Sequence, residues 1–85
     1  MRGEQLLHKA INTFEGRRAN YGDPNQIFND VAKRWSRALG KQITAPEVVM
    51  CMIELKLTRL KNDPANFDSI MDIAGYAACL WEVSE

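Results

Sequence analysis

Two cations and two carboxylates in the second half of the chain have types and spacing suited to chemistry. Lys56 and Arg59 are three positions apart, so they share one face of a helix. Asp68 and Asp72 are four apart and share a face as well. If the chain turns back near Pro64, an antiparallel helix pair sets positions that sum to about 128 opposite each other. This register sets Lys56 against Asp72 and brings Arg59 near Asp68.

The cluster has two interpretations. Cations bind phosphate oxygens and carboxylates hold Mg²⁺, which predicts a phosphate or nucleotide site with Lys56 and Arg59 as ligands of the phosphate. Asp68 and Asp72 are then the metal ligands. The alternative is a structural lock of interhelical salt bridges, because removing one partner of a buried ion pair is strongly destabilising. The spacing fits both.

A second candidate site follows the first helix, where Arg17 and Arg18 precede Tyr21, Gly22 and Asp23. Arginine and a helix N-terminus both favour phosphate, and a tyrosine ring can stack on a base. Arg18, Tyr21 and Asp23 are therefore candidate ligand-binding residues. The alternative is turn chemistry, in which Gly22 permits a positive φ, Asp23 caps a helix and Tyr21 packs on the bundle.

The other reactive residue types form no catalytic pattern. His8 is the single histidine and has no acid nearby in sequence. Cys51 and Cys79 are predicted to be free buried thiols of a reducing compartment, and they lack metal-binding spacing. The alternative is a disulfide, because the hairpin register makes the two residues neighbours. Trp35 and Trp81 occur at core spacing and are predicted to pack in the interior. No catalytic residue is assigned, which argues against an enzyme.

Four helices must position these residues, and together they predict an all-α fold in a single domain, residues 1–85. Apolar residues recur at helical spacing in four segments, approximately residues 3–14, 24–39, 45–61 and 67–83. The first is the shortest, so we expect a compact bundle of three long helices plus an N-terminal one, with an antiparallel hairpin formed by the last two.

Terminal signals support these boundaries. Gly16 and Gly40 are predicted to end the first and second helices, and Asp23 is a good N-cap for the second. Thr44, followed three residues later by glutamate, has the form of a capping box. Asn66 is predicted to cap the last helix.

The last two helices differ in composition. The third is apolar on almost all sides, which predicts a central place in the core. The fourth has a strip of small residues that includes Ala74, Gly75, Ala77 and Ala78. Small residues allow close approach of another helix, which accounts for a glycine in mid-helix. A homodimer is one way to cover the apolar surface of so small a domain.

Charge and hydropathy narrow the classes of partner. The formal net charge of the 85 residues is zero, which argues against a dedicated nucleic-acid binder. No apolar run is long enough for a membrane span, and the N-terminus lacks a signal-peptide pattern. A cytoplasmic location in a bacterial host cell is expected.

Four motifs in combination resemble a small family of tailed bacteriophages and prophages. They are Arg18-x-x-Tyr21-Gly22-Asp23-Pro24, Phe28-x-x-x-Ala32-x-x-Trp35, Lys56-x-x-Arg59-Leu60 and Asp68-Ser69-x-x-Asp72-Ile73-Ala74-Gly75-Tyr76. The family in turn is distantly similar to the MazG-like all-α nucleotide pyrophosphatases, which hold Mg²⁺ with two acidic motifs on paired helices.

The resemblance to MazG-like enzymes is incomplete at the metal site. Asp68-x-x-x-Asp72 stands about where the second acidic motif would be. The first acidic motif is missing, because Glu54 stands alone and Lys56 and Arg59 occupy positions where carboxylates would be expected. A lysine there repels Mg²⁺ and pairs with the opposing aspartate instead. The resemblance therefore implies the helical hairpin but argues against pyrophosphatase activity.

The function these observations favour is that of a phage or prophage accessory protein. It would act without catalysis or a cofactor, as an interaction module on a host or phage protein, for instance as an inhibitor of host defence. The alternative is a Mg²⁺-dependent nucleotide-binding or pyrophosphatase-like protein.

Overall fold

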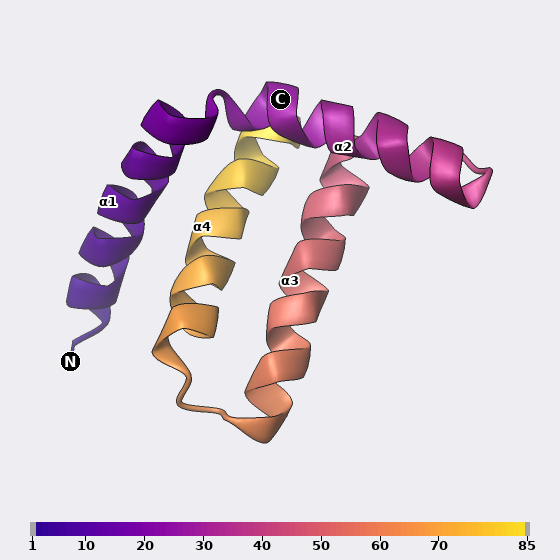
Figure 1. Ribbon diagram of the computed structural model, residues 1–85. Coiled ribbons are helices and arrows are strands. Elements are labelled where there is room, and N and C mark those ends of the chain that lie inside the picture. Colours follow the sequence, from indigo (N-terminus) through magenta and orange to yellow (C-terminus); the bar gives the residue numbers. More distant parts are fainter. Residues whose placement is uncertain (1, 85) are drawn as a thin grey trace.

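The protein is all-helical, as the sequence predicts. The computed structural model describes residues 2–84 and contains no strand within them. Its four helices are shown in Figure 1: α1 (Gly3–Tyr21), α2 (Pro24–Leu39), α3 (Ala45–Asn62) and α4 (Phe67–Ser84). No helix within the described residues is long and apolar enough to cross a membrane.

Three of the helices lie side by side and the fourth crosses them. In Figure 1, α4 lies between α1 and α3, and α2 runs across the ends of this layer. The contacts agree, because α4 packs against all three other helices while α2 packs on α3 and α4. The α3–α4 hairpin that the sequence predicts is therefore present, and both α1 and α2 pack against it.

The first helix is longer than predicted. Gly16 does not end it, and α1 continues to Tyr21 for a length of 19 residues. A glycine inside a helix costs about 1 kcal/mol, yet α1 continues past Gly16, and Arg17 and Arg18 in the next turn pair with acidic residues of α4. The helix ends instead at Gly22, whose φ of 94° suits glycine. The bundle thus has four long helices rather than three and a short one.

The other helix ends follow the sequence signals. The backbone N–H of Glu47 donates to Thr44 Oγ1 at 3.3 Å, and the Thr44 N–H donates to Glu47 Oε1 at 2.9 Å, which completes the capping box. Asn66 Oδ1 accepts from the Ser69 N–H at 2.8 Å at the start of α4. Gly40 ends α2 in the left-handed conformation, with φ 67°.

The core is small, and the prediction that α3 lies at its centre holds for the first turns of this helix but is wrong for the rest of it. The buried apolar residues are Ala10, Ala32, Ala45, Val48 and Val49. Beyond its first turns, α3 leaves Met50, Leu55 and Leu57 between 45% and 46% exposed. In a layer one helix thick, every helix has one side open to solvent, because the other helices do not surround it.

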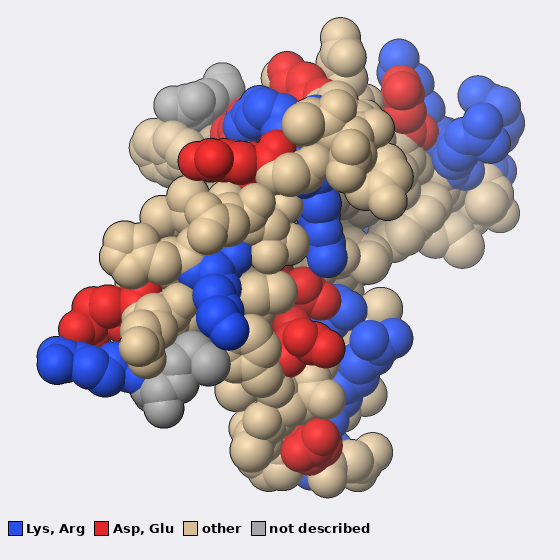
Figure 2. All heavy atoms as spheres, turned by 60° about the vertical axis from the view of Figure 1, so that its left-hand side comes forward, with Lys and Arg blue, Asp and Glu red and all other residues tan. Residues whose placement is uncertain are grey.

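Basic and acidic side chains are mixed on the face that Figure 2 shows. Figure 2 shows Lys and Arg side chains interspersed with Asp and Glu over much of one face, with broad uncharged areas between them. This distribution matches the net charge of zero.

Candidate functional site

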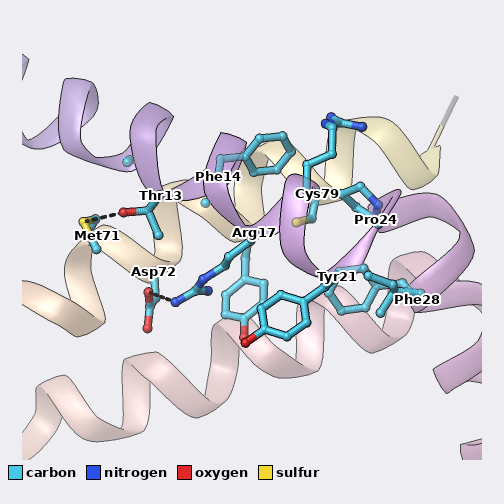
Figure 3. Close-up of a pocket in the computed structure, with 15 residues that line it drawn as sticks. Thr13, Phe14, Arg17, Tyr21, Pro24, Phe28, Met71, Asp72 and Cys79 are labelled. Carbon is cyan, nitrogen blue, oxygen red and sulfur yellow. Dashed lines mark hydrogen bonds and ion pairs between the residues drawn. The ribbon is translucent and has the colours of Figure 1, made fainter.

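A pocket opens between α1 and α4 and is closed at one end by the start of α2. Its volume is about 530 Å³, within the range of small-ligand sites. We call it the α1/α4 pocket. Its charged lining residues are Arg17, Arg18 and Asp72, and its aromatic ones are Phe14, Tyr21, Phe28 and Tyr76. Figure 3 shows Arg17 pointing across the pocket toward Asp72, with the Tyr21 ring in the middle of the view and Phe28 at the end away from Asp72.

Two glycines give the pocket its shape. Gly22 makes the turn from α1 into α2, where Asp23 accepts a hydrogen bond from the Asn25 N–H at 2.9 Å and so starts the next helix. Gly75 lies in the α4 wall, and no atom lies within 4 Å of the place where its Cβ would be. The prediction that Gly75 admits a close helix neighbour is therefore wrong within this chain. Its missing side chain leaves room in the pocket instead.

Asp72 is held by two cations. Lys56 Nζ lies 3.1 Å from Asp72 Oδ2, and the two side chains are only 12% and 15% exposed. Arg17 approaches the other carboxylate oxygen at 3.7 Å from the pocket side. The 128-sum register thus matches the position of Lys56 opposite Asp72. With both of its oxygens facing a cation, Asp72 is a poor ligand for a further cation.

The second pair expected at the hairpin does not form. No ion pair joins Arg59 to Asp68 among residues 2–84, and both residues are exposed. Pairing of exposed charges gains little against the side-chain entropy it costs, so nothing holds these two together near the turn. Asp68 also does not line the α1/α4 pocket, whereas Asp72 does. The described residues contain no group of three or more side chains placed to hold a metal.

Arg18 connects three helices rather than facing an empty space. Its guanidinium donates a hydrogen bond to Glu82 near the end of α4, lies 3.9 Å from Asp23 at the start of α2, and lies 5.1 Å from the centre of the Phe14 ring. The hydrogen bond to Glu82 raises the pKa of Arg18 above its ordinary value. Of the two arginines, Arg17 is the more exposed, at 56% against 44%.

The aromatic lining divides into a packed part and an open part. Phe28 and Tyr76 meet edge to face, with ring centroids 6.4 Å apart. Tyr21 is 72% exposed, so the prediction that it packs on the bundle is wrong. Because α1 extends to residue 21, Tyr21 stands at the end of this helix and lines the pocket from its open side. It is free to stack on a ligand.

Two further ionisable groups in the lining are shielded from water. Burial raises the pKa of Tyr76, and the negative charge of Asp72 raises it further. Burial likewise raises the pKa of the Cys79 thiol, with a contribution from Glu82. Both groups are neutral at neutral pH. The expectation of two buried cysteines is wrong for Cys51, which is exposed.

Sequence reasoning missed several residues of the pocket. Arg17, Phe14 and Gly75 were not assigned to a site, and neither was Tyr76. The signal was present, because positions 10, 13, 14, 17 and 21 share a helical face once Gly16 is accepted inside the helix. Lys56 contacts Asp72 but does not line the pocket, and Arg59 does neither.

The comparisons with known proteins give a family. Residues 5–84 match the domain of unknown function DUF6378. The chain belongs to the DUF6378 family. This DUF6378 chain is 37% identical over 83 residues to the Gene 55 protein of Mycobacterium phage D29, a match that covers 96% of the chain and 55% of that protein. It is 34% identical over 77 residues to the Gene 55 protein of Mycobacterium phage L5, covering 88% of the chain and 49% of that protein.

The DUF6378 chain thus spans about half the length of these curated phage relatives. The relatives support the expected resemblance to a phage family whose function is not established. No solved structure matches the chain at a significant level. The likeness to MazG-like enzymes stays a prediction.

Proposed function

We propose that the protein is a non-catalytic phage accessory protein that binds a host or phage protein through the α1/α4 pocket. The observation that carries this proposal is the state of Asp72. It is the acidic residue of the pocket lining, and Lys56 and Arg17 already neutralise it. General acid–base or metal-assisted chemistry needs a carboxylate that is free to accept a proton or a metal. Recognition needs only the shape and polarity of the pocket.

The lining suits the anchor residue of a protein partner. Tightly binding interfaces place a few apolar or aromatic side chains in desolvated pockets, with arginine and tyrosine enriched around them. The α1/α4 pocket offers an apolar interior with Arg17 and the exposed Tyr21 at its edge. A partner segment with an apolar anchor followed by a carboxylate fits this pattern, since the carboxylate would meet Arg17. Action inside the host cytoplasm follows from such a role.

A substitution that fills the α1/α4 pocket tests the proposal, because it should abolish binding of the partner protein. Gly75→Leu places a side chain into the open space of the α4 wall, while Ala19→Leu adds the same side chain at an exposed position of α1 outside the lining. A partner captured by the wild-type protein from infected host cells is purified, and its affinity is measured with all three proteins. The proposal requires that Gly75→Leu loses binding and Ala19→Leu keeps it. Equal affinities would contradict it.

A second candidate is a nucleotide ligand, favoured by the combination of Arg17 with the Tyr21 and Tyr76 rings in one pocket. Arginine would hold the phosphates and an aromatic ring would stack on the base. A thermal-shift panel of nucleoside mono- and triphosphates, with and without Mg²⁺, tests this candidate. A ligand at a hundred times its Kd adds about 2.7 kcal/mol of stability, a shift of several degrees in a domain of this size.

The pyrophosphatase alternative has a separate readout. It requires a Mg²⁺-dependent shift and release of pyrophosphate, with Asp68 and Asp72 as the metal ligands. The α3–α4 hairpin agrees in outline with a MazG-like ancestry. Two observations argue against catalysis. Lys56 and Arg59 are cations where the enzymes have carboxylates, and Asp68 is not among the residues that line the pocket. A Mg²⁺-independent shift that Arg17→Gln abolishes would instead favour nucleotide binding without turnover.

A further inference from the structure

Helix α4 has a second face, on the side away from the pocket. Its pocket residues, such as Met71, Gly75 and Cys79, recur every four positions. At 100° per residue the opposite side of the helix carries Ile70, Ala74, Ala77 and Trp81, with Ala78 at its edge. We call this set the outer face of α4. It contains no charged residue and extends about 17 Å along the helix axis.

The outer face is poorly covered by the rest of the chain. Trp81 is 68% exposed, and Ala77 and Ala78 are exposed beside it. The prediction that Trp81 packs in the interior is therefore wrong for a single copy. An exposed tryptophan next to alanines leaves a large ring and a flat apolar strip in water, an arrangement more typical of interfaces than of free surface.

The molecule exposes more accessible surface area than a compact monomer of the same mass. Its accessible area is 6102 Å², whereas a compact monomer of 9.7 kDa exposes about 5,100 Å². The radius of gyration, 13.7 Å, likewise exceeds the value of about 12 Å expected for 85 residues. The excess area, about 1,000 Å² over the whole molecule, includes the exposed part of the outer face of α4.

We propose that the outer face of α4 is the interface of a homodimer. Two copies of α4 would cross in antiparallel fashion about a two-fold axis near Ala77 and Ala78. This arrangement lays Trp81 of each copy against Ala74 of the other, so that the large ring meets a small residue and the alanines permit close approach of the two helices. Both α1/α4 pockets then face away from the axis and stay open.

A second copy suits this face better than a charged partner. The face has no charge to satisfy, and the net charge of zero means that two copies do not repel each other. A two-fold interface must be complementary to itself. A face with its bulk at one end and small residues in its middle satisfies this condition when it is paired antiparallel.

The experiment measures molar mass by analytical ultracentrifugation over a dilution series. The wild-type protein is compared with Trp81→Glu and with Leu39→Glu, a control in α2 whose wild-type side chain is also 68% exposed. Because a buried aromatic anchor contributes about 2 kcal/mol or more, Trp81→Glu should raise the dimer Kd at least about 30-fold. Circular dichroism checks that each variant folds, and Ala78→Glu, at an exposed position of the same face, replaces any variant that does not.

The outcomes separate the possible occupants. A wild-type dimer that Trp81→Glu or Ala78→Glu dissociates and Leu39→Glu leaves intact supports the proposal. A wild-type protein that stays monomeric at every concentration overturns it, because a second copy then does not cover the face. A dimer that survives both outer-face substitutions overturns it as well, because the interface then lies elsewhere.

Discussion

Two charge clusters at the edges of the same pocket use similar chemistry in different surroundings. Asp72 meets Lys56 between α3 and α4, where both side chains are at most 15% exposed. Arg18 meets Glu82 and Asp23 where α1, α2 and α4 converge, and its side chain is 44% exposed. Buried charges cannot be hydrated, so Lys56 and Asp72 must stay paired. Water can solvate Arg18 and Glu82 when their ion pair is broken. The exposure of two paired charges is therefore a better guide to their contribution to stability than the distance between them.

The largest expected effect comes from breaking the buried pair. Lys56→Met leaves Asp72 shielded with only Arg17 nearby, so the free energy of unfolding should fall by about 3 kcal/mol. Urea denaturation followed by circular dichroism measures this change. Adding Asp72→Leu to Lys56→Met should recover most of the loss, because the unpaired buried charge is removed. A single variant as stable as the wild type would show that the pair is not a structural lock.

The next effect concerns Gly75, which lies on α4 between Asp72 and Glu82. Gly75→Ala should raise the free energy of unfolding by up to about 1 kcal/mol, because alanine has the higher helix propensity and its methyl group meets no atom within 4 Å. The same methyl group narrows the pocket. Denaturation of Gly75→Ala beside an Ala19→Gly variant, which should be destabilised by a similar amount, tests the account. A destabilised Gly75→Ala would mean that the wall has no free space.

Removing the exposed cluster should matter less. Arg18→Gln loses the hydrogen bond to Glu82 and the contact with Phe14, and we expect a melting temperature slightly below that of the wild type at low salt. Because exposed charges are screened, the difference should shrink as salt is added. Lys56→Met is the matched comparison, since its deficit should persist in salt. A large, salt-independent loss for Arg18→Gln would reverse the ranking of the two clusters.

The smallest effect is a dependence on alkaline pH. Burial raises the pKa of Cys79 and of Tyr76 above the ordinary values of 9.0 and 10.0. The unfolded chain therefore loses these protons first, and the free energy of unfolding should decrease as the pH rises above about 9 and on through the folded-state pKa values. Chemical denaturation at pH 7 to 11 measures the slope. The double variant Cys79→Ala/Tyr76→Phe should be flatter than the wild type over this interval.

Local signals explain why most of the fold could be predicted. The helix starts at Asp23, Thr44 and Asn66 depend on side chains that bond to the backbone within three residues, so the sequence nearby determines them. The position of Lys56 opposite Asp72 also follows from hairpin symmetry. These features need no knowledge of distant packing.

The errors arose where distant contacts decide the outcome. Gly16 lies inside α1, and beyond it Arg17 and Arg18 meet acidic partners on α4 that are more than fifty residues away in sequence. That extension moves Tyr21 and creates the α1/α4 pocket, so a single misplaced helix end concealed most of the site. The exposure of Met50, Leu57 and Trp81 could not be predicted either, because an apolar helix looks the same in sequence whether its own chain or another molecule covers it.

The attachment of α1 has a consequence for motion. The helix packs chiefly on α4 and contributes one buried residue, Ala10, to the core. Segments with few buried contacts open at a lower free energy than the whole domain unfolds. The amide hydrogens of α1 should therefore exchange with solvent before those of the α3–α4 hairpin. Since α1 is one wall of the pocket, local opening of this helix would admit or release a ligand. A bound ligand would therefore slow the exchange of amide hydrogens along α1.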